Sequence, residues 1–458
     1  MNLSYYHQLC QIKYPWQCFC SHDRIRSDHN SACVLQGPKA CGKTRLALKF
    51  LENHPKHIYF SFSDLSSDTA IKLFLKQIGD SENNNTITDW KSTFDYAVPY
   101  LKKGRYVLVF DDVDSFVGNT EFLSALSEFM NDKNSPWIFV MLLVRNIECL
   151  HGTGVVYYPI KLTYRSIADI AKAFPEISNK DVLRLYTLSG GIPAILDLYD
   201  AEKSFEDNLS DWLRYDSKYF TFFTELLKDE FRTPETYLSI LYSIANGNHR
   251  ISEIGDDLAF PYNKCDKYIH SLMHIGLVTA TQKEGSKRSE YHITNSYTKF
   301  WLRELYHNRN ILTPNADCNF IVSIMERLDE QYTFPCYKKA CIRFMREFYS
   351  YEFPRKFSKL QEKNGEPLTV KLSENEDFTF DFTSREGKYM LFVKIQSDFE
   401  TCQNKDTLLK TMDASEKEHV FYDSILLVFG INRFSDYCVH TASTLENLKL
   451  IPITQLKY

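Results

Sequence analysis

The clearest indication of the fold of this 458-residue chain is the stretch Gly37-Pro38-Lys39-Ala40-Cys41-Gly42-Lys43-Thr44. It fits the phosphate-binding pattern G-x-x-x-x-G-K-[ST] at every defined position. An apolar run at 31–36 precedes it and an amphipathic run at 45–52 follows it, so we expect a loop between a strand and a helix. The backbone N–H groups of such a loop and the positive end of the helix that follows it bind phosphate oxygens.

The defined positions of this loop each have a chemical role. Gly37 and Gly42 lack the Cβ atoms that would block the close approach of a phosphate. Lys43, which we expect on an exposed loop, reaches the β- and γ-phosphates as a point charge, and Thr44 places a hydroxyl on Mg²⁺. The whole stretch 37–44 is therefore the predicted nucleotide-binding loop, with Lys43 also acting in catalysis.

A second motif supports this prediction. The apolar run 106–110 ends in the paired carboxylates Asp111 and Asp112. In phosphate-loop proteins such an aspartate completes the Mg²⁺ shell, usually through water, and we assign that role to Asp111. Asp112 can orient or deprotonate the attacking water. We expect Asp114, which follows closely, to be a loop residue.

Arg145 follows the apolar run 138–144, where a polar side chain can contact the γ-phosphate. The arginine could instead act across a subunit interface. A solvated surface arginine is an equally good interpretation, because a lone charge specifies little.

The order of elements predicts an α/β fold with a parallel sheet. Strands expected at 31–36, 57–62, 106–110 and 138–144 alternate with helical stretches, and their continuous apolar runs suit strands buried on both faces. Short helices at 166–174 and 180–188 then lead to a break at Gly190, Gly191 and Pro193. Three helices and a hairpin between 236 and 293 predict a winged helix. Strands at 377–382 and 389–395, joined by 384–388, together with a strand at 424–429, predict a small C-terminal α/β domain.

Composition narrows the class of protein. The net charge of -5 and the 25% of charged residues are those of a globular chain and not of a wholly basic nucleic-acid binder. The segment 1–19 has no apolar core like that of a signal peptide, and no run approaches the ~20 residues of a membrane span. The 12 cysteines are scattered, so we expect free thiols, a cytoplasmic location and no membrane. Cys18, Cys20 and His22 have the spacing of a partial metal site, but no second ligand pair lies nearby.

Together these motifs resemble archaeal-type ATPases of the STAND/AAA+ group. The resemblance rests on the phosphate loop, on Asp111-Asp112, on the break at 188–193 and on a junction formed by 291–295 with Phe300-Trp301. It implies ATP as the nucleotide and a helical lid containing Gly190, Gly191 and Pro193. It also implies a C-terminal domain similar to PD-(D/E)xK nucleases. The corresponding boundaries are a P-loop ATPase domain at 1–165, the lid at 166–230, the winged helix at 231–305 and the nuclease-like domain at 306–458.

The chain departs from the family's pattern in three places. The segment 19–26 matches poorly the family's opening F-x-x-R-x-x-E. Asp112 stands where the family usually has glutamate, and its shorter side chain predicts slow hydrolysis. In the C-terminal domain Asp381 and Lys394 suit a nuclease site, but Phe392 and Ile342 stand where further acids are expected. We therefore expect a nuclease-like fold without nuclease activity, because Mg²⁺ needs several oxygen ligands.

The sequence is compatible with three functions. The first is an ATP-driven molecular switch with slow Mg²⁺-dependent hydrolysis that acts on an unknown protein partner, with a homo-oligomer as a further option. The second is an ATP-dependent DNA-binding or nucleic-acid-processing protein, whose recognition helix at 263–274 carries Lys264, Lys267 and His270. The third is a nuclease effector.

Overall fold

The computed structural model describes residues 31–79, 87–282, 288–310, 318–351, 382–386, 389–396, 423–445 and 448–456, together with residues 399 and 409. The chain divides into two compact units. The P-loop unit consists of 10–164 with 192–194, and the second unit consists of 1–9, 165–191 and 195–458. We describe each unit by itself.

The P-loop unit is built on a five-stranded sheet with the order β2-β3-β4-β1-β5. All neighbouring strands are parallel. The bounds are Ser31–Gln36 for β1, His57–Ser61 for β2, Tyr106–Asp111 for β3, Ile138–Val144 for β4 and Tyr157–Lys161 for β5. The expected α/β fold with a parallel sheet is confirmed. The sequence had not indicated β5, because this edge strand is largely exposed and contains a proline.

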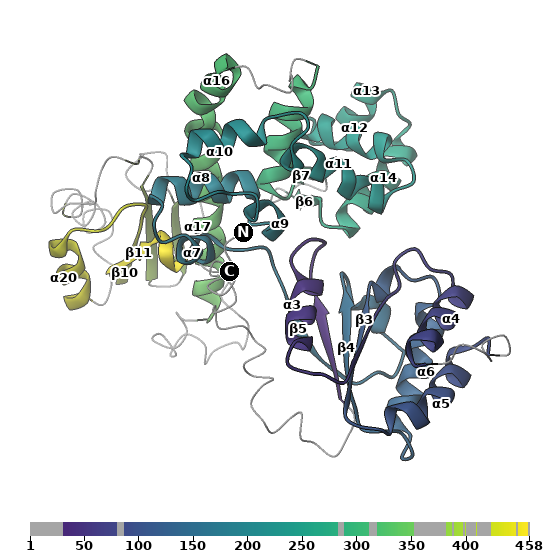
Figure 1. The fold of residues 1–458 in the computed structure, drawn as a ribbon. Coiled ribbons are helices and arrows are strands. Elements are labelled where there is room, and N and C mark those ends of the chain that lie inside the picture. Colours follow the sequence, from purple (N-terminus) through teal and green to yellow (C-terminus); the bar gives the residue numbers. More distant parts are fainter. Residues whose placement is uncertain are drawn as a thin grey trace. The chain divides into compact units, whose positions relative to one another are not determined.

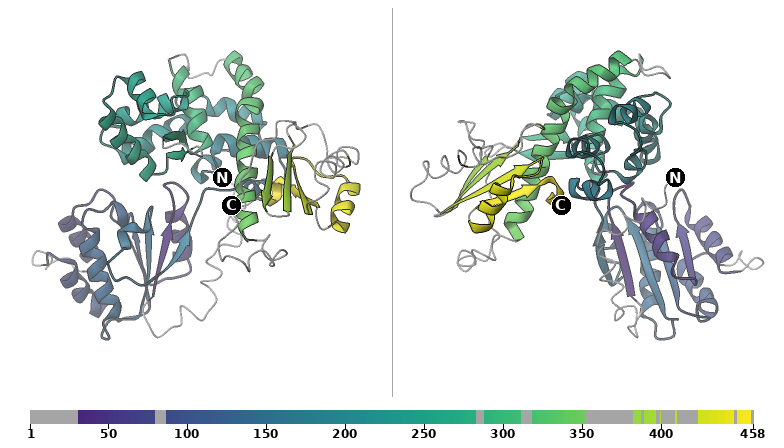
Figure 2. Two further views of the ribbon diagram at one scale, coloured as in Figure 1. Left: turned by 180° about the vertical axis from the view of Figure 1, so that it is seen from behind. Right: turned by 60° about the vertical axis from the view of Figure 1, so that its left-hand side comes forward.

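Helices cover both faces of this sheet (Figure 1). Helix α3 (Lys43–Leu51) packs on one face through Ala47 and Phe50. Helices α4 (Ser67–Gln77), α5 (Trp90–Leu101) and α6 (Asn119–Asn131) cover the other face, as two further views also show (Figure 2).

The core under α4, α5 and α6 is an aromatic cluster. Its rings contact one another at centroid distances of 4.4–6.4 Å. Each fully buried phenylalanine contributes roughly 1.5–3 kcal/mol of hydrophobic free energy. The cluster consists of Phe60, Phe62, Phe74, Trp90, Phe94, Phe110, Phe116, Phe122 and Phe129.

The second unit begins with helices α7 (Ile167–Ala173), α8 (Asn179–Ser189), α10 (Phe205–Trp212) and α11 (Lys218–Glu230); the short α9 (Pro193–Leu196) follows the glycine break. Ser166 and Asp169 form a capping box that starts α7, and Ser178 caps α8. Helix α8 ends at Gly190, whose φ of 58° lies in the left-handed region. A Cβ at Gly190 would lie 1.9 Å from Oδ1 of Asn295, so only glycine fits this turn.

Three helices and a hairpin come next. Their bounds are Pro234–Ala245 for α12, Ile251–Leu258 for α13 and Tyr262–His274 for α14, followed by β6 (Val278–Gln282) and β7 (Ser289–Ile293). The strands pair antiparallel. The order of elements agrees with the sequence expectation, while the assignment to the winged-helix class stays a prediction. Helix α15 (Ser296–Phe300) then runs into a π-helix, η3 (Trp301–Tyr306).

The C-terminal part contains a four-stranded sheet of order β11-β10-β9-β8. It is preceded by α16 (Cys318–Leu328), a second π-helix η4 (Asp329–Thr333) and α17 (Phe334–Tyr351). The sheet consists of β8 (Phe382–Glu386), β9 (Tyr389–Ile395), β10 (Asp423–Gly430) and β11 (Leu448–Pro452), with α20 (Asp436–Thr444) between the last two. The residues 384–386, expected in a turn, lie in β8, which pairs antiparallel with β9. The remainder of the strand expected at 377–382 lies outside the described residues.

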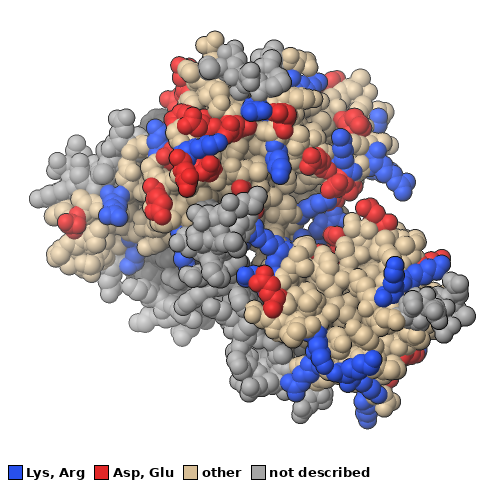
Figure 3. Space-filling view, viewed as in Figure 1, with Lys and Arg blue, Asp and Glu red and all other residues tan. Residues whose placement is uncertain are grey.

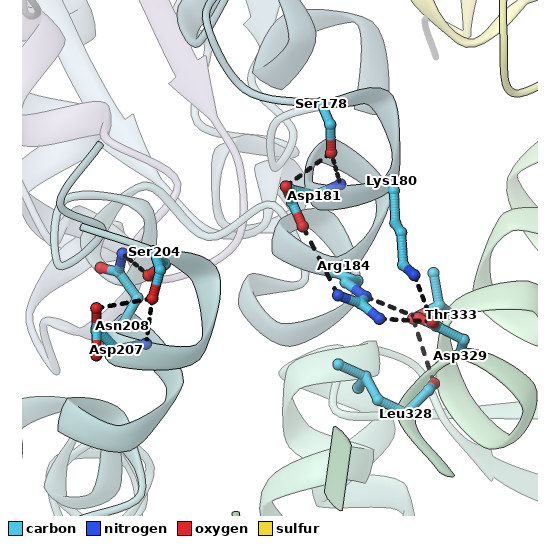
Figure 4. Close-up of polar contacts among 10 residues, drawn as sticks. All are labelled: Ser178, Lys180, Asp181, Arg184, Ser204, Asp207, Asn208, Leu328, Asp329 and Thr333. Atoms are coloured by element: carbon cyan, nitrogen blue, oxygen red, sulfur yellow. Dashed lines mark hydrogen bonds and ion pairs between the residues drawn. The ribbon is translucent and has the colours of Figure 1, made fainter. Parts of the chain in front are cut away.

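The parts of the second unit are joined by polar contacts (Figure 4). Nε and Nη2 of Arg184 on α8 donate to the two carboxylate oxygens of Asp329 on η4, at 2.8 and 2.6 Å. Lys180 lies 3.7 Å from the same carboxylate. Nδ2 of Asn179 donates to the carbonyl of Ile431 after β10, at 2.7 Å. Helix α8 therefore contacts both the π-helix η4 and the C-terminal sheet.

The sequence also raised the questions of a metal site and of a membrane-spanning segment. Cys18, Cys20 and His22 lie outside the described residues. Within the described part of the chain, no group of three or more His, Cys, Asp or Glu side chains has the arrangement of a metal site. None of the helices that the structure describes is long and apolar enough to cross a bilayer.

Candidate nucleotide-binding site

The phosphate loop and the carboxylate at the end of β3 meet at one side-chain contact. Oγ1 of Thr44 donates to Oδ2 of Asp111 at a distance of 2.6 Å. The two residues are 67 positions apart, and they meet because β1 and β3 both run toward the same edge of the sheet, with β4 between them. A hydroxyl and a carboxylate are oxygen ligands of the kind that Mg²⁺ prefers. The residues present therefore fit a magnesium ion, with Thr44 and Asp111 as the groups that would hold it.

Lys43 folds back over its own loop. Its Nζ donates to the carbonyls of Gly37 and Pro38, at 2.7 and 3.0 Å. The residue is only 8% exposed and begins α3, so the expectation of an exposed loop lysine was wrong. The reason is that the ammonium, with three donors to satisfy, binds nearby carbonyls of its own loop.

The loop holds an unusual backbone conformation. Ala40 and Gly42 have φ values of 61° and 97°, which costs free energy at a residue with a Cβ. A Cβ on Gly37 would lie 2.6 Å from the carbonyl oxygen of Leu162 and 2.8 Å from Sγ of Cys41. The loop is held from the outside by Tyr164, whose hydroxyl donates to the carbonyl of Lys39 at 3.0 Å.

Tyr59 is a site residue that sequence reasoning missed. It lies on β2, the strand next to β3, and its hydroxyl donates to Oδ2 of Asp111 at 2.8 Å. Oδ1 of Asp111 accepts a hydrogen bond from the backbone N–H of Asp112, at 2.8 Å. Burial and the Asp111 carboxylate raise the pKa of Tyr59, so the tyrosine stays a proton donor. No motif predicts it, because only the strand order places β2 beside β3.

Asp112 is strained and half-buried. Its φ of 56° is left-handed, a region that aspartate tolerates better than most residues. Burial raises the pKa of its carboxyl group above the usual range, and the Asp111 carboxylate raises it further. The charges of Arg145 and Lys43 act in the opposite direction. A carboxylate with a raised pKa beside a second carboxylate is a chemically suitable proton acceptor.

Arg145 is held by Asp114. Oδ2 of Asp114 accepts hydrogen bonds from the backbone N–H groups of Arg145 and Asn146, at 3.0 and 3.3 Å, and lies 3.4 Å from Nε of Arg145. Asp114 lies in the 3₁₀ turn η1 (Val113–Ser115) of the connection after β3, as expected of a loop residue, and the sequence did not indicate its contacts with Arg145 and Asn146. The Arg145 side chain is 28% exposed, so it is not a freely solvated arginine. Whether it contacts a γ-phosphate stays a prediction.

The structure thus brings the predicted residues Lys43, Thr44, Asp111 and Asp112 to one edge of the sheet, and the charge of Arg145 acts on Asp112 there. The other predicted loop residues, from Pro38 to Cys41, lie in the turn between β1 and α3. Among these Cys41 is buried, at 3% exposure, and packs with the core under α3.

Comparison with known proteins gives matches of three kinds. Residues 25–144 match the family described as AAA domain. The chain is 21% identical over 359 residues to an uncharacterized protein of Methanocaldococcus jannaschii, MJECL04; the match covers 74% of this chain and 78% of that protein. Among solved structures, Aeropyrum pernix Orc1 in complex with DNA is 14% identical with a TM-score of 0.37, and the match covers 67% of this chain and 94% of that one. A Thermotoga maritima RuvB structure is 14% identical with a TM-score of 0.34, covering 59% and 89%.

The match to the AAA domain spans the phosphate loop and all of β1 to β4, and ends at the last residue of β4. The geometry described above is that of the nucleotide site of such a domain, with the loop lysine, the loop threonine and the strand-end aspartate at one edge of a parallel sheet. The P-loop unit of this chain therefore contains an AAA-type nucleotide-binding ATPase domain.

Proposed function

We propose that the chain binds ATP with Mg²⁺, hydrolyses it slowly and acts as a nucleotide-dependent switch of the STAND/AAA+ type. The observation that supports this best is the 2.6 Å hydrogen bond between Thr44 and Asp111. This direct side-chain contact joins the phosphate-binding loop to the end of β3, where the proposal places the metal. In this proposal Mg²⁺ neutralises charge that develops on the phosphates, and the chain's own groups position them.

Each residue of the site has a role in this proposal. The backbone N–H groups of 37–44 hold the phosphates, and Lys43 exchanges its bonds to the loop carbonyls for bonds to phosphate oxygens. Thr44 and Asp111 hold the metal. Asp112 accepts a proton from the attacking water, and Arg145 contacts the γ-phosphate.

Slow hydrolysis follows from the surroundings of Asp112. The aspartate side chain is one methylene shorter than glutamate, and its left-handed backbone fixes where the carboxylate can reach. Arg145, the nearest arginine charge, is engaged by Asp114. Both features limit how strongly the transition state is stabilised, which suits a protein whose bound state carries the signal.

The switch also needs an element that responds to the nucleotide, and the second unit supplies one. Nδ2 of Asn295 donates to the carbonyl of Gly190 at 3.0 Å, and the hydroxyl of Tyr297 donates to the carbonyl of Tyr219 at 2.9 Å. Together with the Arg184–Asp329 pair, these contacts join the helices after the P-loop unit to α15 and to the C-terminal part. We propose that the second unit moves as one body when nucleotide binds, and that a protein partner or another copy of the chain reads this movement.

The C-terminal sheet serves in this proposal as a binding or regulatory domain. Phe392, which stands where a nuclease needs an acid, is fully buried among Leu426, Val428, Cys438 and Leu448. Ile342 lies on α17 and supplies no oxygen ligand. Lys394 lies two residues after Phe392 on β9, and Asp381 lies outside the described residues.

The nucleotide proposal is tested by thermal unfolding with and without ATP and Mg²⁺. A ligand that binds the native state raises the melting temperature by mass action, so we expect an increase for the wild type. Lys43→Ala should abolish this increase while the protein stays folded. Arg45→Ala, one residue from the end of the loop on the exposed side of α3, is the matched control and should keep it. An increase that survives in Lys43→Ala would contradict the assignment.

The second candidate, DNA binding, rests on the exposed side of α14. Lys264, Lys267, His270 and His274 are all solvent-exposed, and Asp266 is the acid among them, 3.5 Å from His270. On the face drawn in Figure 3, basic and acidic side chains are interspersed over the second unit, so no broad basic field surrounds this helix there. A DNA-binding assay on Lys264→Gln/Lys267→Gln tests this candidate.

A further inference from the structure

A basic patch lies at the end of the P-loop unit's sheet that is opposite the phosphate loop. Strands β2, β3 and β4 are parallel neighbours, so their first residues lie side by side. The residues directly before these strands are Lys56, Arg105 and Trp137. Lys102 and Lys103 belong to the turn between α5 and β3. We call Lys56, Lys102, Lys103, Arg105 and Trp137 the basal patch.

The patch is held together by specific contacts. Nζ of Lys56 donates to the carbonyl of Lys103 at 2.6 Å, which ties the start of β2 to the turn before β3. The lysine lies across Gly104, where a Cβ would be 2.3 Å from Nζ, so the glycine leaves the space that the lysine occupies. The Arg105 guanidinium lies over the Trp137 ring, 4.5 Å from its centroid, as in a cation–π contact. The cations are thus placed by the fold and not only scattered over it.

Nothing described in the chain neutralises these charges. The four cations Lys56, Lys102, Lys103 and Arg105 are exposed, and none of them forms an ion pair with a described residue. Two acids at helices of the same unit are already paired, Glu52 with Lys49 and Glu128 with Lys91. Basic side chains gather at the lower end of this unit in Figure 3. The four positive charges of the patch repel one another although the chain as a whole has a net charge of -5. A bound anion would offset this repulsion.

We propose that the basal patch binds the phosphate backbone of a nucleic acid. Lysines and arginines on one surface match a polymer that carries one charge per phosphate, and most contacts of nucleic-acid-binding proteins go to that backbone. The Arg105–Trp137 pair adds a planar cation and an aromatic ring, the kinds of group on which nucleic-acid bases stack. The patch is separate from α14 and from the nucleotide site, so the proposal does not depend on the function of either.

The experiment measures the binding of a labelled oligonucleotide of mixed sequence, single-stranded and duplex, to the full chain over a range of salt concentrations. We expect Lys102→Gln/Lys103→Gln to lose affinity on the order of tenfold per lysine at about 0.1 M salt. The salt slope should fall by about one to two, because two phosphate contacts are removed. The matched control is Lys72→Gln/Lys76→Gln, which removes the same charge from the exposed side of α4 in the same unit.

Three outcomes would overturn the proposal. The first is equal loss in the two double variants, which would show an effect of net charge only. The second is loss in Lys264→Gln/Lys267→Gln together with unchanged binding in the basal variant, which would place the nucleic acid on α14. The third is absence of oligonucleotide binding by the wild type; binding to vesicles that contain phosphatidylserine would then point to a lipid headgroup as the anion. Melting temperatures of all variants, which should match the wild type, show that they are folded.

Discussion

At the scale of single residues, Asp112 stands where its negative charge is disfavoured. Its pKa is raised by burial and by Asp111. A carboxyl group with a raised pKa in the folded state favours folding below its ordinary pKa, and this contribution is lost as the pH rises through the raised value. At neutral pH the ionised group therefore costs stability. We expect Asp112→Asn to raise the melting temperature of the nucleotide-free protein at pH 7 and to lower turnover by about two to four decades.

The pH dependence of turnover provides a second test of the role of Asp112 as proton acceptor. If Asp112 accepts the proton, the acid limb of kcat/KM should lie at higher pH than an ordinary aspartate gives, and it should be absent from the residual activity of Asp112→Asn. Asp111→Asn is the matched variant. It should weaken the dependence on Mg²⁺ and should not raise the melting temperature, since Thr44 and Tyr59 lose an anionic acceptor. Small and equal effects of both changes would place the pair outside the active site.

The hydrogen bond from Tyr59 to Asp111 leads to a further prediction about a single residue. Its hydroxyl holds Oδ2 of Asp111 at 2.8 Å, and a hydrogen bond to a charged group contributes about 1.5–3 kcal/mol. Tyr59→Phe should therefore raise the Mg²⁺ concentration needed for half-maximal turnover about tenfold or more, with little change in KM for ATP at saturating metal. Tyr164→Phe, which loses the bond to the Lys39 carbonyl, should instead raise KM for ATP. The same Mg²⁺ dependence in Tyr59→Phe and wild type would count against a positioning role.

At the scale of elements, the junction between α8 and α15 depends on one glycine. Gly190→Ala forces a Cβ into Asn295 at a left-handed φ of 58°. It also disturbs Asn295, which caps α15 through the N–H of Tyr297. We expect a loss of about 2 kcal/mol in the free energy of unfolding, measured by denaturant titration. Gly276→Ala is the control, because its φ of 77° is also left-handed and a Cβ there would have no neighbour within 4 Å. A loss no larger than that of the control would show that the Asn295 contact contributes nothing.

How far the sequence predicts each element depends on where its signal lies. Strands β1 and β4 are predicted with their observed bounds, because buried parallel strands are continuous apolar runs. Asp111 and Thr44 are predicted to lie close together because the sequence assigns both of them to the same Mg²⁺ site. Tyr59 and Asp114 could not be predicted, because their partners are set by the order of strands and by the turn after β3. The buried position of Lys43 was likewise hidden, since the bonds that bury it are made to backbone carbonyls of its own loop.

At the scale of the whole molecule, we expect the C-terminal sheet to act as a binding or regulatory domain and not to cleave nucleic acid. Phe392 is fully buried in its core and cannot ligate a metal. We expect the full chain, incubated with plasmid, single-stranded DNA or RNA in Mg²⁺ or Mn²⁺, to leave each of them intact. The readout is gel electrophoresis, with Asp381→Ala prepared in parallel. Metal-dependent cleavage that disappears in Asp381→Ala would show a working nuclease and would overturn this view of the domain.

The aromatic cluster under α4, α5 and α6 has a consequence for how the molecule can be observed. Trp90 is fully buried among phenylalanines, so its fluorescence should be blue-shifted and should report on the P-loop unit. Trp212 and Trp301 lie in the second unit and are also buried. A chain with Trp90 replaced by Phe lacks this signal and keeps the other tryptophans, among them Trp137 of the P-loop unit. The difference between the two emission spectra during heating would then follow the unfolding of the P-loop unit through Trp90 alone, and would show whether nucleotide delays that step.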